Sequence, residues 1–431
     1  MNEVALLFPG QGSQYVGMGQ AFYNDFSIAR RTFEEASDVL GMNMAKLCFE
    51  GDINELTKTE NAQPAIMTCS VASYLVFQEC LNLIPKCYAG HSLGEYTALV
   101  CAGYIDFRDG LKIVNSRGKY MQESVLGNEG AMYAIYDIDF DTIRNECNAF
   151  LEKDLVVEIS NYNAPNQVVI SGHTDAVREV GNSLKSKGAK VMPLRVSAPF
   201  HCSLMSTAAQ KMEKELNKYK FNSSSSYVLS NASALPYLSE KEIINNLTKQ
   251  MTAPVLWHDC MKFIVSLGIN QAIELGPKKV LKNLTEKSGL NIEVHSCECS
   301  DDIQSLIEKT GEKSADYTDI TKYRLSIIER CLAAAVCSKN YKYNSEEYSN
   351  NVVRPYKKLK GLYEHFEKNM EQLDEKKVLQ AVEILHSILK NKGLCEEEKS
   401  SWLKDVIRNE ERLYLSKELR TRYEELINMT R

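Results

Sequence analysis

The sequence predicts an α/β protein in which helices flank a parallel sheet, followed by an extension made of helices. Before residue 300, short apolar runs that end in glycine or proline turns alternate with helical patterns, which is typical of a parallel sheet. After residue 315 the apolar periodicity is helical throughout. The runs that predict strands are VALLFP (4–9), KCYAG (86–90) and NQAIELGP (270–277).

A smaller unit is predicted inside the first. Residues 130–138 predict a strand, 139–153 a helix, 156–163 and 167–173 two strands, 174–188 a helix and 189–197 a strand. This β-α-β-β-α-β order is the ferredoxin-like arrangement. We therefore expect a ferredoxin-like subdomain at 129–197, inserted into a core of residues 1–128 and 198–300. A substrate cleft is expected between the two.

Residues 301–431 are expected to form a helical extension, which either packs on the core or on a partner or is a solvated appendage with no chemistry. The segment is dense in charge, yet its acidic and basic side chains balance. One helix is predicted with Asp374 as its N-cap and Gly393 as its stop. Its apolar stripe consists of Val378, Val382, Leu385 and Leu389.

Composition excludes several classes of protein. A net charge of −6 argues against a nucleic-acid partner. The 13 cysteines lack metal-ligand spacing and a disulfide framework, so we expect reduced thiols, no metal and a cytoplasmic location. The N-terminus does not resemble a signal peptide, and no apolar run is long enough to span a membrane.

Ser92 is the candidate nucleophile. It lies in CYAGHSLGEYTALV (87–100), between a predicted strand and a predicted helix. Such a Gly-X-Ser-X-Gly turn presents a hydroxyl above a sheet edge, with the N–H groups of the next helix near any oxyanion. The same pattern also arises by chance. A serine needs a base, and His201 in SAPFHCSLM is the candidate because it follows the last subdomain strand, whereas His91 is expected to pack or to bond to backbone.

Two further segments fit a serine enzyme. The turn FPGQGSQ matches no phosphate-binding fingerprint, so a backbone N–H of Gln11 is interpreted as an oxyanion donor. Arg117 in NSRGKYMQE follows on the next helix. It is a surface charge by default, but facing the cleft it would bind a carboxylate through two hydrogen bonds, which lysine could not reproduce.

With these segments in place, the sequence closely resembles the malonyl-CoA:acyl-carrier-protein transacylase family, which includes the acyltransferase domains of polyketide synthases. The resemblance covers residues 1 to about 300, with the motifs in family order. They are FPGQGSQYVGMG (8–19), QPAIMTCSVASY (63–74), GHSLGEYTALVCAG (90–103), SRGKYMQE (116–123), NYNAPNQVVISGH (161–173), APFHCSLM (198–205) and ELGPKKVL (274–281).

The resemblance implies an α/β-hydrolase-like core with a ferredoxin-like insertion, and it implies a role for each matching residue. Ser92 would be acylated, and His201 would act as base and then as acid. The remaining implied roles are a histidine-orienting carbonyl near Gln250, oxyanion donors on the backbone of Gln11 and Leu93, a carboxylate partner in Arg117, and a lining made by Gln63, an asparagine of NYN (Asn161 or Asn163) and Phe200.

The implied reaction moves malonyl from malonyl-CoA to the phosphopantetheine thiol of an acyl carrier protein, with no cofactor. Basic side chains are expected to dock the acidic carrier protein, either Lys185, Lys187 and Lys190 or Lys278, Lys279 and Lys282, although a solvated charged face is the favoured explanation for either group on its own. Fatty-acid enzymes of this type end near residue 310, so the extension favours a discrete acyltransferase serving polyketide synthase modules. Three alternatives stay open: housekeeping fatty-acid synthesis, an acyl hydrolase of the same fold, and a silent docking module.

Overall fold

The computed structural model describes residues 3–81, 83–124, 130–150, 155–194, 196, 198–224, 226–310, 315–341, 345–369, 373–406, 422–423 and 425–426. The chain divides into two compact units. The first contains Met1–Phe22, Ile28–Gln78 and Leu83–Gly311, and the second contains Tyr23–Ser27, Glu79–Asn82 and Glu312–Arg431.

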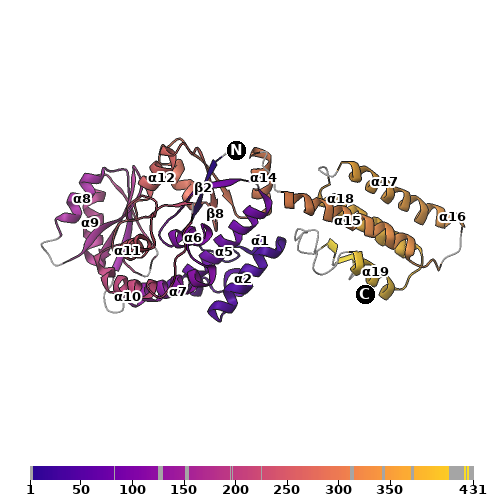
Figure 1. Cartoon of the computed structure of the whole chain (residues 1–431), viewed down its shortest axis with the longest axis horizontal. Coiled ribbons are helices and arrows are strands. Elements are labelled where there is room, and N and C mark those ends of the chain that lie inside the picture. Colours follow the sequence, from indigo (N-terminus) through magenta and orange to yellow (C-terminus); the bar gives the residue numbers. More distant parts are fainter. Residues whose placement is uncertain are drawn as a thin grey trace. The chain divides into compact units, whose positions relative to one another are not determined.

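The first unit is built on a parallel sheet of five strands in the order β7-β2-β1-β8-β9. Helices flank this sheet (Figure 1), which confirms the predicted α/β class. The three apolar runs predicted as strands are β1, β2 and β8. The strands are β1 (Glu3–Phe8), β2 (Ile84–Gly90), β7 (Tyr227–Val228), β8 (Gln271–Leu275) and β9 (Glu293–Cys297).

Burial on both faces explains the continuous apolar sequence of β1. Neighbouring residues of a strand point to opposite faces of the sheet. Leu7 belongs to the core cluster that contains Trp257, whereas the Phe8 ring lies 6.5 Å from the rings of both Tyr74 and Tyr88. The central strand is therefore fixed between two packed layers.

The helices before residue 311 lie in the first unit, apart from the residues of α1, α2 and α5 that the second unit contains. They are α1 (Gln20–Asp25), α2 (Ser27–Leu40), α3 (Met44–Glu50), α4 (Ile53–Thr57), α5 (Thr59–Cys80), α6 (Leu93–Cys101), α7 (Phe107–Glu123), α8 (Phe140–Asn148), α9 (Thr174–Ser186), the 3-10 turn η2 (Ser203–Met205), α10 (Ser206–Leu216), α11 (Glu240–Gln250), α12 (Trp257–Ser266), α13 (Val280–Glu286) and α14 (Ser300–Thr310).

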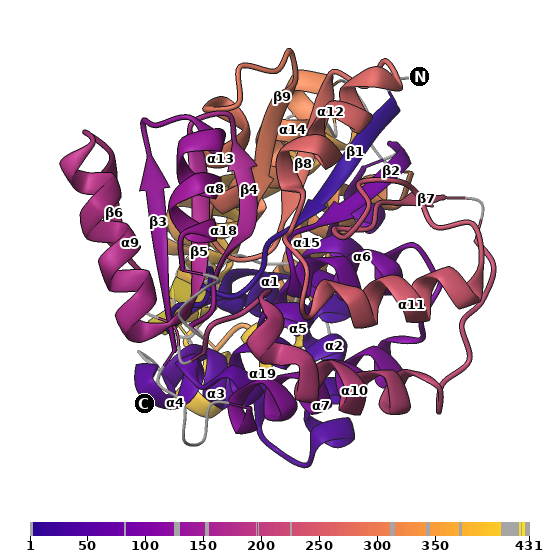
Figure 2. The same cartoon turned by 90° about the vertical axis from the view of Figure 1, so that its left-hand side faces the viewer.

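A second sheet has four antiparallel strands in the order β4-β5-β3-β6. They are β3 (Gly130–Tyr136), β4 (Val157–Ala164), β5 (Gln167–His173) and β6 (Lys190–Pro193). The elements follow one another in the predicted order, β3-α8-β4-β5-α9-β6. Helices α8 and α9 share a core with the sheet (Figure 2). The last predicted strand ends at Pro193 rather than at residue 197, and residues 195 and 197 lie outside the described part.

In the described residues after 315, every regular element is helical, as predicted. Helices α15, α17 and α18 pack on one another (Figure 1). Asp374 caps α18 by accepting from Lys377 N at 2.9 Å, and Gly393 follows its end with φ 78°. The predicted stripe of α18 is buried. The elements are α15 (Ala315–Cys337), α16 (Ser345–Tyr348), the π-helical turn η3 (Ser349–Val353), α17 (Arg354–Lys368), α18 (Glu375–Asn391) and α19 (Glu396–Val406).

Lys392 ties two of these helices together. Its ammonium group is buried and donates to the carbonyls of Ala335 and Ser338 at 2.8 and 2.7 Å, at the C-terminal end of α15. Those carbonyls lack partners within their own helix.

None of the described helices combines the length and the apolar content that crossing a membrane requires.

Candidate active site

Ser92 lies at a sharp turn between β2 and α6. Its φ of 55° and ψ of −106° are unusual for a residue with a side chain. A Cβ on Gly90 would lie 1.9 Å from the carbonyl carbon of Gly94, and a Cβ on Gly94 would lie 2.0 Å from the carbonyl oxygen of Phe8. Close backbone approach therefore demands both glycines around this serine.

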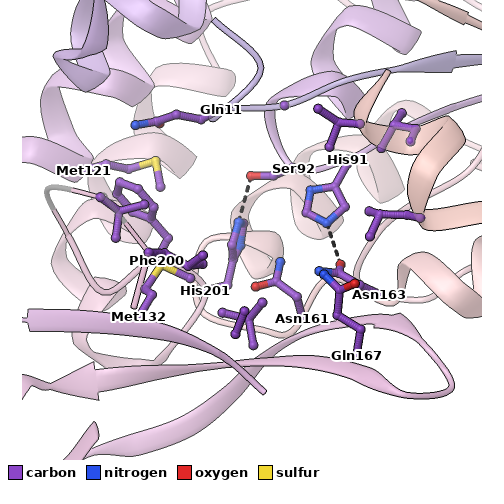
Figure 3. A pocket seen from close by; sticks show the side chains of 18 of the residues that line it. Gln11, His91, Ser92, Met121, Met132, Asn161, Asn163, Gln167, Phe200 and His201 are labelled. Carbon is purple, nitrogen blue, oxygen red and sulfur yellow. Dashed lines mark hydrogen bonds between the residues drawn. The ribbon is translucent and has the colours of Figure 1, made fainter. Parts of the chain in front are cut away.

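His201 is in hydrogen-bond contact with Ser92, although 108 residues separate them in the sequence. Its Nε2 lies 2.7 Å from Ser92 Oγ (Figure 3). Its Nδ1 lies 2.7 Å from the carbonyl oxygen of Gln250. A carbonyl can only accept, so Nδ1 carries the hydrogen and Nε2 is free to accept the proton of the serine hydroxyl. Burial, and secondarily the charge of Arg117, lower the pKa of His201 to about 3. The imidazole is therefore neutral at pH 7.

Arg117 projects from α7 toward the same serine and is only 1% exposed. One terminal nitrogen donates to Gln63 Oε1 at 3.0 Å, and the other donates to Gln250 Oε1 at 2.9 Å and to Ser92 Oγ at 3.1 Å. Its guanidinium carbon lies 5.2 Å from the ring centre of Tyr96. Burial lowers the pKa of this guanidinium. All three hydrogen-bond acceptors are neutral, so the cation is held without a carboxylate in contact.

These groups meet in a cavity of about 230 Å³. Most of the residues singled out from the sequence line it (Figure 3): Gln11, Ser92, Arg117, Asn161, Asn163, Phe200 and His201. His91 lines the cavity as well. As expected it packs, with its ring 5.7 Å from that of Trp257, and its Nε2 lies 2.9 Å from Asn163 Oδ1. Leu93, Gln63 and Gln250 are not among the lining residues, and the latter two contact Arg117 instead.

Two backbone N–H groups are available near the serine. Leu93 is the first residue of α6, where N–H groups have no partner within the helix. No hydrogen bond joins the N–H of Leu93 or of Gln11 to another described residue. The N–H of Ser92 itself is occupied by Asn231 Oδ1 at 2.7 Å.

The sequence analysis missed a buried layer beneath the serine. Asn231 Nδ2 donates to the carbonyl of Gly90 at 2.8 Å, and the N–H of Asn231 donates to Glu95 Oε2 at 3.0 Å. Glu95 also accepts from the hydroxyl of Tyr237. The signal that could have revealed this layer is the carboxylate itself, because Glu95 interrupts the apolar helix LGEYTALVC three residues after Ser92.

The expected docking lysines are only partly free. Lys187 pairs with Glu146, and Lys278 donates to the carbonyls of Gly12 and Gln14 at 3.2 and 3.1 Å. Lys185 and Lys279 are exposed. Across the described residues, no three His, Cys, Asp or Glu side chains gather in a way that could hold a metal ion.

A serine hydrogen-bonded to a neutral histidine shares one cavity with a buried cation, and two backbone N–H groups are available near the serine. Together these features define a serine-dependent acyl-transfer enzyme. Comparison with known proteins shows to which family of acyl-transfer enzymes the chain belongs. The chain belongs to the acyl transferase family, whose domain matches residues 5–308.

Curated relatives and solved structures agree with this assignment. The chain is 37% identical over 396 residues to the malonyl CoA-acyl carrier protein transacylase of Bacillus subtilis, an alignment that covers 92% of this chain and 96% of the relative. It is 43% identical over 288 residues to the enzyme of that name from Escherichia coli K12, covering 67% of this chain and 93% of the relative. A malonyl-transacylase solved with its type II polyketide synthase acyl-carrier protein shares 39% identity at a TM-score of 0.70, covering 72% of this chain and all of that one.

We predict that a neutral fluorophosphonate labels Ser92 at a rate that changes less than about threefold between pH 5 and 8. The reason is that His201, with its pKa lowered to about 3, stays unprotonated throughout this range. Labelling is followed by intact-protein mass spectrometry. His201→Gln should slow it by at least about a hundredfold. A rate that halves near pH 6.5 would show that His201 titrates as an ordinary histidine.

Proposed function

We propose that the protein transfers a malonyl group from malonyl-CoA to the phosphopantetheine thiol of an acyl carrier protein. The observation that carries this proposal is the buried guanidinium of Arg117, which lies beside the nucleophile and has neutral acceptors. Such a cation is incompletely compensated until an anion arrives, and the free carboxylate of malonyl fits it. The names of the relatives support the same reaction.

In the first half of the reaction Ser92 becomes esterified. His201 Nε2 takes the hydroxyl proton while Oγ forms a bond to the thioester carbonyl carbon. The backbone N–H groups of Gln11 and Leu93 stabilise the oxyanion, and the carbon–sulfur bond then breaks. The proton held by His201 passes to the sulfur, so coenzyme A leaves as a thiol. The malonyl carboxylate remains paired with Arg117.

The second half uses the same groups in reverse. The thiol of the carrier protein gives its proton to His201 as its sulfur bonds to the ester carbonyl. The Ser92 oxygen leaves and recovers the proton. Both reactions exchange one ester-type bond for another, so no cofactor is needed. The site must chiefly keep water from the malonyl ester, and His201 with only 4% exposure suits that task.

Substrate selection is proposed to come from four further side chains. Gln63 holds one terminal nitrogen of Arg117. Asn161 and Asn163 face the acyl group from β4, and Asn163 is itself held by His91. Phe200 lies directly before His201 and fills the space that a 2-methyl branch would need.

The extension supports a role in polyketide synthesis rather than in housekeeping fatty-acid synthesis. The alignment with the Bacillus subtilis relative covers 92% of this chain, so it must include most of residues 312–431. The Escherichia coli relative aligns with 67% of the chain. A recurring extension on some members is expected if they serve synthase modules in trans, although the fatty-acid role fits the catalytic site equally well.

Two finer expectations are proposed alongside the reaction. The strand order of the smaller sheet supports a ferredoxin-like subdomain in an α/β-hydrolase-like core. Ten of the 13 cysteines are buried, and their spacing predicts no disulfide framework, which supports a reducing compartment such as the cytoplasm.

We predict that radiolabel from malonyl-CoA moves to a phosphopantetheinylated carrier protein faster than it is released as malonate. An acyl hydrolase would release the label instead, and a docking module would leave it on coenzyme A. Ser92→Ala is the matched control because it removes only the attacking oxygen. Transfer that persists in this variant would contradict the proposed nucleophile.

We predict that Arg117→Ala lowers kcat/KM for malonyl-CoA by on the order of a hundredfold, because the malonyl carboxylate would be buried without its partner. Acetyl-CoA has no carboxylate, so its slow acylation of Ser92 should change much less. Arg117→Lys serves as the control that keeps the charge but cannot form two parallel hydrogen bonds. Equal losses with both donors would contradict the assigned role of Arg117.

A further inference from the structure

Glu95 is a buried carboxyl group that the reaction does not use directly. It lies in the first turn of α6, three residues after the nucleophile, and has 0% exposure. Its Oε2 accepts from the N–H of Asn231 at 3.0 Å and from Gln250 Nε2 at 2.6 Å. Its Oε1 accepts from the hydroxyl of Tyr237. A carboxylate accepts all three bonds, and two of these donors are N–H groups that could accept nothing in return.

The contact with Glu95 is the shortest of three that set which way the Gln250 amide points, the other two acceptors being the Ser92 carbonyl and Asn231 Oδ1. The nitrogen of that amide donates to Glu95 and, at 3.0 Å, to the carbonyl of Ser92. The oxygen of the same amide therefore faces Arg117 and accepts from it at 2.9 Å. A flipped amide would set an NH₂ group against the guanidinium and an oxygen against the carboxylate, which is unfavourable on both sides.

We propose that Glu95 is a positioning residue for malonyl selectivity, which acts through the side-chain amide of Gln250 to hold the guanidinium of Arg117 where it meets the malonyl carboxylate. The inference rests on the proposed function. It also separates two roles of Gln250, whose backbone carbonyl orients His201 while its side chain orients Arg117.

The intervening amide keeps the two charges apart. No hydrogen bond or ion pair joins Glu95 to Arg117 in the described structure, so the resident carboxylate does not occupy the place that the substrate needs. The charge of Glu95 still stabilises the charged form of Arg117 by electrostatic attraction. Direct pairing would give a stable ion pair that malonyl would have to displace.

Four titratable groups interact with Glu95: the guanidinium of Arg117, the phenols of Tyr96 and Tyr237, and the thiol of Cys260. Burial raises the pKa of Glu95 to about 7, while the bond from Tyr237 is the largest opposing influence. Protonation of Glu95 near neutral pH would weaken its hold on the Gln250 amide. Malonyl preference should therefore decline as the pH falls through this range.

A graded pair of variants tests the proposal. Glu95→Gln keeps an oxygen that accepts from Gln250 and an NH₂ group that can donate to Tyr237, whereas Glu95→Ala removes the hold on the amide. The measured quantity is the ratio of kcat/KM for malonyl-CoA to that for acetyl-CoA, from the mass of the acylated protein. We expect this ratio to fall less than about tenfold in Glu95→Gln and by on the order of a hundredfold in Glu95→Ala.

A double-mutant cycle separates positioning from general damage to the site. If Glu95 acts through Arg117, then Glu95→Ala in an Arg117→Ala background should reduce the ratio by less than about twofold. Additive losses would overturn the proposal.

Gln250→Met provides a second route should Glu95→Ala fail to fold, because it keeps the backbone carbonyl and removes the amide. In that background Glu95→Gln should have no further effect on the ratio, and a further loss would overturn the proposal.

The pH dependence of the malonyl-to-acetyl ratio distinguishes the proposal from a merely structural role of Glu95. A structural role would give the same pH dependence in the unaltered protein and in Glu95→Gln. The malonyl-to-acetyl ratio of the unaltered protein should decline severalfold from pH 8 to pH 6, and that of Glu95→Gln should stay constant. Identical profiles would overturn the proposal. An unaltered protein that malonyl-CoA does not acylate at all would instead refute the proposed function.

Discussion

The guanidinium of Arg117 lies beside the nucleophile with almost no exposed surface, and the rest of the site is arranged around this buried charge. Holding a cation out of water costs free energy unless several acceptors surround it. Gln63, Gln250 and Ser92 supply these acceptors without a negative charge. No carboxylate contacts the guanidinium within the described structure, and the proposed function assigns that place to the carboxylate of the substrate.

The same charge links binding to reactivity. Arg117 helps to lower the pKa of His201, which makes the imidazole a weak base while the acyl site is empty. A malonyl carboxylate on Arg117 would offset that influence and leave His201 better able to take the proton of Ser92. In the proposed mechanism, a bound malonyl carboxylate would therefore contribute to selectivity through reactivity as well as affinity, because it would make His201 a stronger base toward Ser92.

Sequence patterns identified the residues that belong to a recognisable local motif. The glycines around Ser92 could be interpreted because a Cβ on Gly90 or on Gly94 would lie only 1.9 or 2.0 Å from backbone atoms. Strands β1, β2 and β8 of the parallel sheet could be recognised from their apolar runs, whereas β7 and β9 were not predicted. The layer formed by Glu95, Asn231 and Tyr237 could not be predicted in this way. Its members come from helix α6 and from the connection between β7 and α11, and only the fold shows that a glutamate in a short helix is enclosed. The bond of His91 to Asn163 likewise joins residues 72 positions apart.

The most direct test is a crystal structure of the protein trapped as its malonyl ester. The account predicts a malonyl group on Ser92 Oγ whose free carboxylate accepts from both terminal nitrogens of Arg117, with the Gln250 amide nitrogen still on Glu95. An ester whose carboxylate points to solvent, or a guanidinium that has turned away from Ser92, would contradict it.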